Sequence, residues 1–117
     1  MTDDESPIRC WSLAGAREIL AEVRRHTSEA VTQIGEIDAR RSELPAGSSG
    51  RKQLDDDVHR AVAKWTRAME ALGVEVHGSW RVGFDNGEGY FCWRWPEPEI
   101  AYFRGYDDED DARARIQ

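Results

Sequence analysis

The chain has 117 residues and a formal net charge of −7, with 16 basic and 23 acidic side chains. This length fits one domain and leaves no room for two independent hydrophobic cores. Nucleic acid and anionic membrane surfaces are not expected partners, because affinity for a phosphate backbone needs clustered positive charge. No stretch approaches the roughly 18 apolar residues that a membrane span requires.

The N-terminal segment and the cysteines bear on location. Residues 1–11 begin with Met-Thr-Asp-Asp-Glu, which is acidic where a signal peptide would be basic and then apolar. We interpret them as an N-terminal extension. Without an export signal, the two cysteines, Cys10 and Cys92, are expected to be free thiols in a reducing compartment. The sequence therefore predicts a cytoplasmic protein.

The first long segment, about residues 12–43, has the period of a helix. Ser12 is suited to cap its first turn, because a serine hydroxyl accepts from the amides that a helix start leaves without partners. Apolar or small residues recur in alternating steps of four and three, which indicates a heptad-like seam. The seam consists of Ala16, Leu20, Val23, Thr27, Ala30, Ile34 and Ile37.

A second helix is predicted over about residues 52–72, after a turn rich in proline, glycine and serine. Gly73 is suited to end it in a left-handed conformation, with the hydrophobic contact of a Schellman motif. Three consecutive aspartates, 55–57, are expected in its first turn, where they would favour the positive end of the helix dipole; a metal site is the alternative. Its seam consists of Leu54, Val58, Ala61, Trp65, Ala68 and Leu72.

The length of the first helix bears on assembly. About 30 residues form a helix of about 45 Å, whereas a compact chain of this size has a radius of gyration near 13–14 Å. The helix is therefore expected to extend beyond what its own chain can cover. A second copy is the simplest cover, so the sequence predicts a homodimer formed through the helices.

After Gly73 the hydrophobic period changes to two, and strands are predicted at about 74–77, 80–85, 88–95 and 99–104. Asn86-Gly87, taken as a two-residue hairpin loop, pairs Val82 with Phe91. A four-residue loop at 96–99 pairs Trp93 with Tyr102. The fold class is therefore α+β: a long antiparallel helical hairpin packed on a small antiparallel β-sheet of three to four strands. One domain over 12–105 precedes a flexible acidic tail, 106–117.

The predicted register separates the strand residues onto two faces. One face carries tryptophans and is expected to pack on the helical hairpin. The other face carries Arg81, Tyr90, Cys92, Arg94 and Phe103. Two arginines beside a tyrosine and a thiol suit a bound anion, because guanidinium groups make charge-assisted hydrogen bonds to oxyanions. The alternatives are a solvated face with arginine stems over aromatic rings, or a face that packs in a dimer.

Three segments carry a family resemblance. Trp11-Ser-Leu-Ala-Gly-Ala-Arg, Cys92-Trp93-Arg94 and Glu97-Pro-Glu-Ile-Ala-Tyr-Phe103 resemble the prokaryotic DUF2203 family, whose members have similar stretches in this order. The chain departs from that pattern at Pro96, where glycine is usual, and at Arg104, where histidine is frequent. The resemblance implies an α+β fold and a bacterial cytosolic protein, and it implies no activity.

Catalytic motifs are absent from the sequence. The three histidines, His26, His59 and His77, share no metal or nucleophile motif with one another or with the cysteines. The leading hypothesis is a homodimeric binding or accessory module that takes a small anionic ligand or a protein partner, with no cofactor. The alternative is a small enzyme that uses Cys92, or a metal site with His77. A third interpretation makes the helices an assembly device without a ligand.

Overall fold

The computed structural model describes residues 10–109 and 112–117. Two helices precede an antiparallel sheet whose five strands pair in chain order. The α+β class is thus confirmed, with five strands rather than three to four. The elements are α1 (Leu13–Arg41), α2 (Ser49–Ala71), β1 (Glu75–Gly78), β2 (Arg81–Asp85), β3 (Gly89–Arg94), β4 (Tyr102–Gly105) and β5 (Ala114–Arg115).

The predicted caps form as expected. The Ser12 hydroxyl accepts from the Gly15 amide at 2.9 Å. Gly73 has φ of 83°, and the Val74 amide donates to the Met69 carbonyl at 3.0 Å, which is the outer hydrogen bond of a Schellman motif. Both helices end within a few residues of the predicted limits, because caps depend on local sequence.

The three aspartates lie further into α2 than predicted. α2 begins at Ser49, and the Ser48 hydroxyl caps it by accepting from the Arg51 amide at 3.1 Å. Asp55 instead pairs with Arg41 of α1 at 2.6 Å. Within residues 10–109 and 112–117, no group of three or more His, Cys, Asp or Glu side chains is arranged to hold a metal ion.

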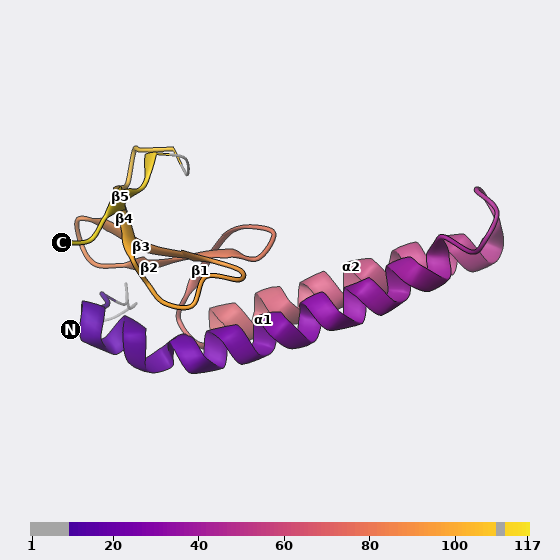
Figure 1. The fold of residues 1–117 in the computed structure, drawn as a ribbon, viewed down its shortest axis with the longest axis horizontal. Helices are drawn as coiled ribbons and strands as arrows, with labels where there is room; N and C mark the ends of the chain where they lie inside the picture. Colours follow the sequence, from indigo (N-terminus) through magenta and orange to yellow (C-terminus); the bar gives the residue numbers. More distant parts are fainter. Residues whose placement is uncertain (1–9, 110–111) are drawn as a thin grey trace, which may run out of the picture.

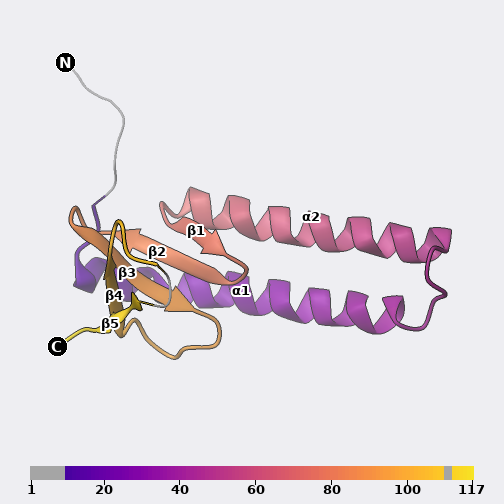
Figure 2. The ribbon, with the colours of Figure 1, turned by 90° about the horizontal axis from the view of Figure 1, so that it is seen from above.

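The helices form a hairpin that is much longer than the sheet is wide. The sheet packs beside the end where α1 begins and α2 ends, and the rest of the hairpin projects away from it (Figures 1 and 2). The molecule measures 53 × 37 × 26 Å and has a radius of gyration of 16.9 Å, against about 13 Å for a compact chain of this length. In the described part of the chain, neither helix is apolar over a length that could cross a membrane.

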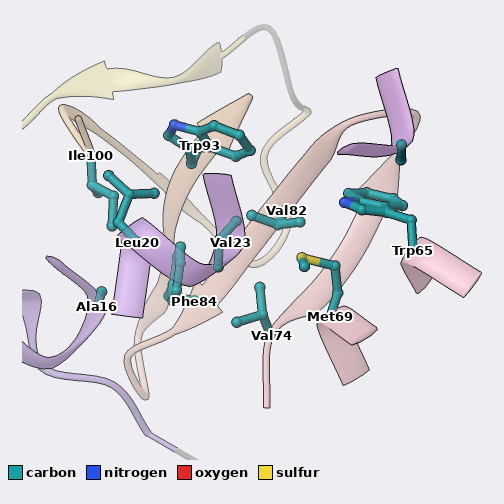
Figure 3. Close-up of a cluster of buried hydrophobic side chains, with 11 residues drawn as sticks. Ala16, Leu20, Val23, Trp65, Met69, Val74, Val82, Phe84, Trp93 and Ile100 are labelled. Atoms are coloured by element: carbon teal, nitrogen blue, oxygen red, sulfur yellow. The ribbon is translucent and has the colours of Figure 1, made fainter. Parts of the chain in front are cut away.

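The hydrophobic core lies between the sheet and the near end of the hairpin (Figure 3). Trp93 and Phe84 are 1% and 0% exposed. The Trp65 indole is also buried, and its N–H donates to the Thr27 hydroxyl at 2.8 Å. Trp80 packs edge-on against Trp65, with ring centroids 4.9 Å apart. The tryptophans therefore join hairpin to sheet, as the predicted separation of the two faces indicated.

The β2–β3 register is two residues away from the predicted one. Val82 lies opposite Trp93 rather than Phe91, because the turn is centred one residue later: the Asn86 amide donates to the Gly89 carbonyl at 2.9 Å, and Gly87 at the tip has φ of 92°. An even shift leaves every side chain on its predicted face.

The β3–β4 register differs by one residue, and this shift does change faces. Tyr102 lies opposite Cys92, and Phe103 lies opposite Phe91 with ring centroids 6.3 Å apart. The preceding loop holds an extra residue, because Ile100 leaves the ladder and is 0% exposed in the core. The predicted placement of Phe103 beside Cys92 is therefore wrong: Phe103 belongs to the core side.

The C-terminal segment belongs to the domain in part. β5 pairs with β4, the Ile116 amide donates to the Ala101 carbonyl at 2.9 Å, and the Ile116 side chain packs against the core. The predicted domain limit at residue 105 is therefore too early, and the described part of 106–117 is not a free tail. Residues 1–9 of the predicted N-terminal extension, and residues 110–111, lie outside the described residues.

Candidate functional site

Four of the five predicted site residues lie on the sheet face that points away from the helices. Arg81 lies opposite Arg94, Cys92 lies opposite Gly83, and Tyr90 lies opposite Asp85. Phe103 is the exception, for the reason given above. Its place across from Cys92 is taken by Tyr102, so an aromatic ring is still present at this position.

Arg81 and Arg94 are the feature of this face that most requires explanation. Like charges directly opposite each other destabilise an antiparallel pair, yet both arginines are half-buried here. Gly78 gives the Arg81 guanidinium its space, since a Cβ atom at Gly78 would lie 2.3 Å from Nη2. Two arginines thus lie opposite each other in a chain whose net charge is −7.

A third arginine, which the sequence did not indicate, joins this pair. Arg113 precedes β5 and lines the same small depression, of about 10 Å³, as Arg81, Cys92 and Arg94. Its guanidinium lies over the Tyr102 ring, 4.0 Å from the centroid. Arg113 falls in the predicted acidic tail, where no hydrophobic period marks a strand, so only the folded chain brings it to the site.

Glu97 holds Arg113 in place. The two side chains form a bidentate pair, with Arg113 Nη2 to Glu97 Oε2 at 2.8 Å and Nη1 to Oε1 at 3.2 Å. Glu97 Oε1 also accepts from the Arg94 amide at 2.9 Å. Burial lowers the pKa of Arg113, but the hydrogen bond and the negative charge of Glu97 outweigh it, so the pKa is raised overall.

His77 lies at the same depression, above the second strand. Its ring covers Gly83, where a Cβ atom would lie 2.2 Å from Cε1. Arg104 Nη2 lies 2.9 Å from Nδ1, and because a guanidinium only donates, Nδ1 is the acceptor and Nε2 carries the proton. That proton points to Glu75 Oε1 at 3.4 Å. The contacts with Arg104 and Glu75 therefore orient the His77 imidazole.

Two tyrosines continue this network. Tyr90 packs edge-on against His77, with ring centroids 4.5 Å apart. The pKa of the Tyr90 phenol is raised, mainly by burial and then by the charge of Glu75 and a hydrogen bond to it. The Tyr106 hydroxyl donates to Asp85 Oδ1 at 2.5 Å, and this bond raises the pKa of Tyr106 to about 12. Both phenols are thereby held in the neutral form.

Cys92 lies at the bottom of the site. Its side chain is 5% exposed, and its thiol donates weakly to the Tyr90 carbonyl at 3.6 Å. Neither cysteine is in a disulfide: Cys10 is exposed and Cys92 is buried. The hydrogen bonds of the His77 ring described above go to Arg104 and Glu75, so the imidazole is not aimed at the thiol as a general base would be.

Comparison with known proteins establishes the family. The model of the family described as "Uncharacterized conserved protein (DUF2203)" matches residues 9–116. The chain belongs to the DUF2203 family. No curated protein and no solved structure matches it. The match includes Arg113 and β5, so the DUF2203 domain extends through the segment that the sequence analysis separated as a tail.

Proposed function

We propose that this DUF2203 protein is a binding module that takes a small anionic group on its outer sheet face. The observation that carries the proposal is the half-buried pair of Arg81 and Arg94, directly opposite each other on β2 and β3. Each guanidinium would donate to a bound oxyanion in a charge-assisted, bidentate manner. Tyr90 and Tyr102 supply aromatic surface beside the arginines.

The test is ligand-induced thermal stabilisation at constant ionic strength, with inorganic phosphate and sulfate as probes. We expect phosphate to raise the unfolding midpoint of the wild type but not of the double variant Arg81→Gln/Arg94→Gln. The matched control is Arg24→Gln/Arg67→Gln, which removes the same charge from exposed helix positions. An equal rise of the unfolding midpoint in all three proteins would refute the proposed anion site.

The same face would also accept a carboxylate from a protein partner. Electrostatic complementarity favours an acidic segment, because the depression is rich in arginine. Stabilisation by an acidic peptide but by neither inorganic anion would favour this form of the proposal.

We further propose a homodimer formed through the hairpin. Within one chain α2 already covers the α1 seam, since Ile37 and Ala61 are 2% and 4% exposed, so helix length alone does not require a partner. In the described part of the chain the sheet does not cover the projecting half (Figure 2), and Val31, Ile34 and Val62 are only half-buried there. Mass measurement in solution tests this: a monomer at tens of micromolar would refute it.

A second candidate function is a small enzyme that uses Cys92. The observation in its favour is that His77 and Cys92 line one depression together with arginines, whose positive charge stabilises a thiolate. The rate of Cys92 alkylation against pH, compared with that of exposed Cys10, measures this reactivity. An inert Cys92 across the pH range would remove the enzyme hypothesis.

The proposed site of action is the bacterial cytoplasm. Two cysteines without a disulfide support a reducing compartment, and the family resemblance is to a prokaryotic family. A cysteine-to-serine variant at position 10 should therefore leave the unfolding midpoint unchanged in both oxidising and reducing buffer.

A further inference from the structure

The helical hairpin carries a groove that no described strand lines. Two depressions, of about 310 and 80 Å³, lie where α1 meets α2, and they adjoin because Ala61 and Lys64 line both of them. Among the described residues, all those that line either depression belong to the two helices. Ile37 and Ala61 are 2% and 4% exposed, so the bottom of this hairpin groove is apolar, and charged side chains form its two walls.

The two walls of the hairpin groove carry opposite charges. Toward the turn between the helices, the α1 wall is negative at two positions and then positive, whereas the α2 wall is positive at two positions and then negative. The charged residues in that order are Glu29, Glu36 and Arg40 on α1, and Lys64, Arg60 and Asp57 on α2. Each wall is therefore complementary to the other at all three positions.

The ion pair between Arg41 and Asp55 shows which wall residues lie at the same height along the hairpin. It joins α1 to α2, with the two atoms 2.6 Å apart. Glu36 precedes Arg41 by five residues, and Arg60 follows Asp55 by five residues. Because antiparallel helices rise equally per residue, Glu36 and Arg60 lie at one height on opposite walls.

No ion pair crosses the hairpin groove in the part of the chain that the structure describes. Glu29 pairs with Arg25, and Asp57 pairs with Arg60, each within its own helix. The cross-helix pair described above involves residues that do not line the groove. The complementary walls are therefore available to the charges of another molecule.

We propose that the hairpin groove takes the same groove of a second copy, related by a two-fold axis that runs along the hairpin. This axis lays α1 of each copy on α2 of the other at the same height. Glu36 then faces Arg60 of the partner subunit, and the reverse contact follows from the symmetry. Charges at such flanking helix positions set the choice and the orientation of the partner.

This inference rests on the proposed homodimer and adds the face and the orientation of its contact. The competing face is the one with half-buried Val31, Ile34 and Val62, none of which lines the groove. A two-fold axis across the hairpin is the competing orientation. It would lay α1 on α1 of the partner subunit, and Glu36 would then no longer face Arg60.

The test is a charge swap, followed by sedimentation velocity at low ionic strength. Glu36→Arg and Arg60→Glu each place like charges opposite each other at two symmetry-related positions. We expect each single variant to raise the dissociation constant of the dimer at least about tenfold, because two attractive pairs become repulsive. The double variant Glu36→Arg/Arg60→Glu restores the attraction, so its dissociation constant should return close to that of the wild type.

The matched control is Arg24→Glu. It makes the same charge reversal at an exposed position of α1 that does not line the groove, and it should dimerise as the wild type does. Glu29→Lys and Lys64→Glu, alone and combined, form a second swap that replaces the first one if a variant folds poorly. Added salt should reduce the differences among all these proteins, since it screens exposed charges.

The outcomes separate this inference from the proposed homodimer. A wild-type monomer at tens of micromolar would refute both. A dimer that survives the single charge reversals but dissociates in Val31→Asp would overturn the groove as the contact and leave the homodimer intact. Single variants that dissociate, without recovery in either combined variant, would overturn the two-fold axis along the hairpin.

Discussion

The two ends of the molecule are built on different principles. Near the sheet, both helices and three strands contribute to one core, and side chains as large as Trp93 and Phe84 are almost fully buried. At the far end, among the described residues, α1 and α2 pack on each other alone (Figure 1), and their seam is closed by smaller side chains, Ile37 and Ala61. Most of the buried apolar surface, and hence most of the hydrophobic stabilisation, lies at the sheet end.

This difference assigns the two ends different tasks. An aromatic core between the sheet and the hairpin packs against one face of β2 and β3, and the arginines lie on the opposite face. A two-helix arm has few buried contacts and opens locally at a lower free energy. The sheet end is thus suited to hold a ligand, whereas the arm is suited to contact a second protein.

The largest expected effect comes from truncating the core at each end. Phe84→Ala should cost about 3–5 kcal/mol of unfolding free energy, and Ile37→Ala in the arm about 2 kcal/mol, because water and neighbouring side chains can fill a cavity between two helices. Denaturant unfolding of the two variants measures the difference. An equal loss of unfolding free energy in both variants would contradict the difference in packing between the sheet end and the two-helix arm.

The junction between the two ends gives the next largest effect. Thr27→Val removes the acceptor of the buried Trp65 indole N–H and should cost about 1–3 kcal/mol, the penalty for an unsatisfied buried donor. Thr66→Val is the matched control: its hydroxyl also donates to a backbone carbonyl of its own helix, at 2.9 Å, but it accepts nothing from a tryptophan. The loss of unfolding free energy in Thr66→Val should stay within about 0.5 kcal/mol. Thermal unfolding of both variants tests whether this single bond couples arm and sheet end.

The smallest effect is a pH dependence confined to the sheet end. The pKa of Tyr106 is raised to about 12 by its hydrogen bond to Asp85, above the usual value near 10. Stability from this bond is complete below pH of about 10 and is lost as the pH rises toward about 12. Tyr106→Phe should lack this alkaline loss. Tyrosinate absorbance of Asp85→Asn, in which the pKa of Tyr106 should return toward about 10, checks the cause.

The helical part of this fold is well predicted from sequence because its determinants are local. The seam from Ala16 to Ile37, the Ser12 cap and the Gly73 termination each depend on residues within a few positions of one another. The seven-residue hydrophobic period also repeats several times along a helix. A single residue that departs from the period therefore does not change the prediction of a helix.

Strand register was predicted less well, since it depends on single residues in the turns. Moving the hairpin centre by one residue shifted β2 against β3 by two, which left the faces unchanged. One additional buried residue, Ile100, shifted β4 by one and put Phe103 on the same sheet face as Phe91. Arg113 could not be assigned at all, because its place depends on contacts with Glu97 and Tyr102, far from it in sequence.

The two outer strands of the sheet have a consequence for self-association. An open sheet edge presents unpaired amides and carbonyls that can pair with another chain and begin aggregation. Here the β1 edge is interrupted by an irregularity between Val76 and Gly78, and the β5 edge is only two residues long. Neither edge offers a neighbouring molecule a long, flat strand to extend. In the proposed dimer, contacts between copies would then fall on the hairpin, and the arginine face would stay open to the proposed ligand.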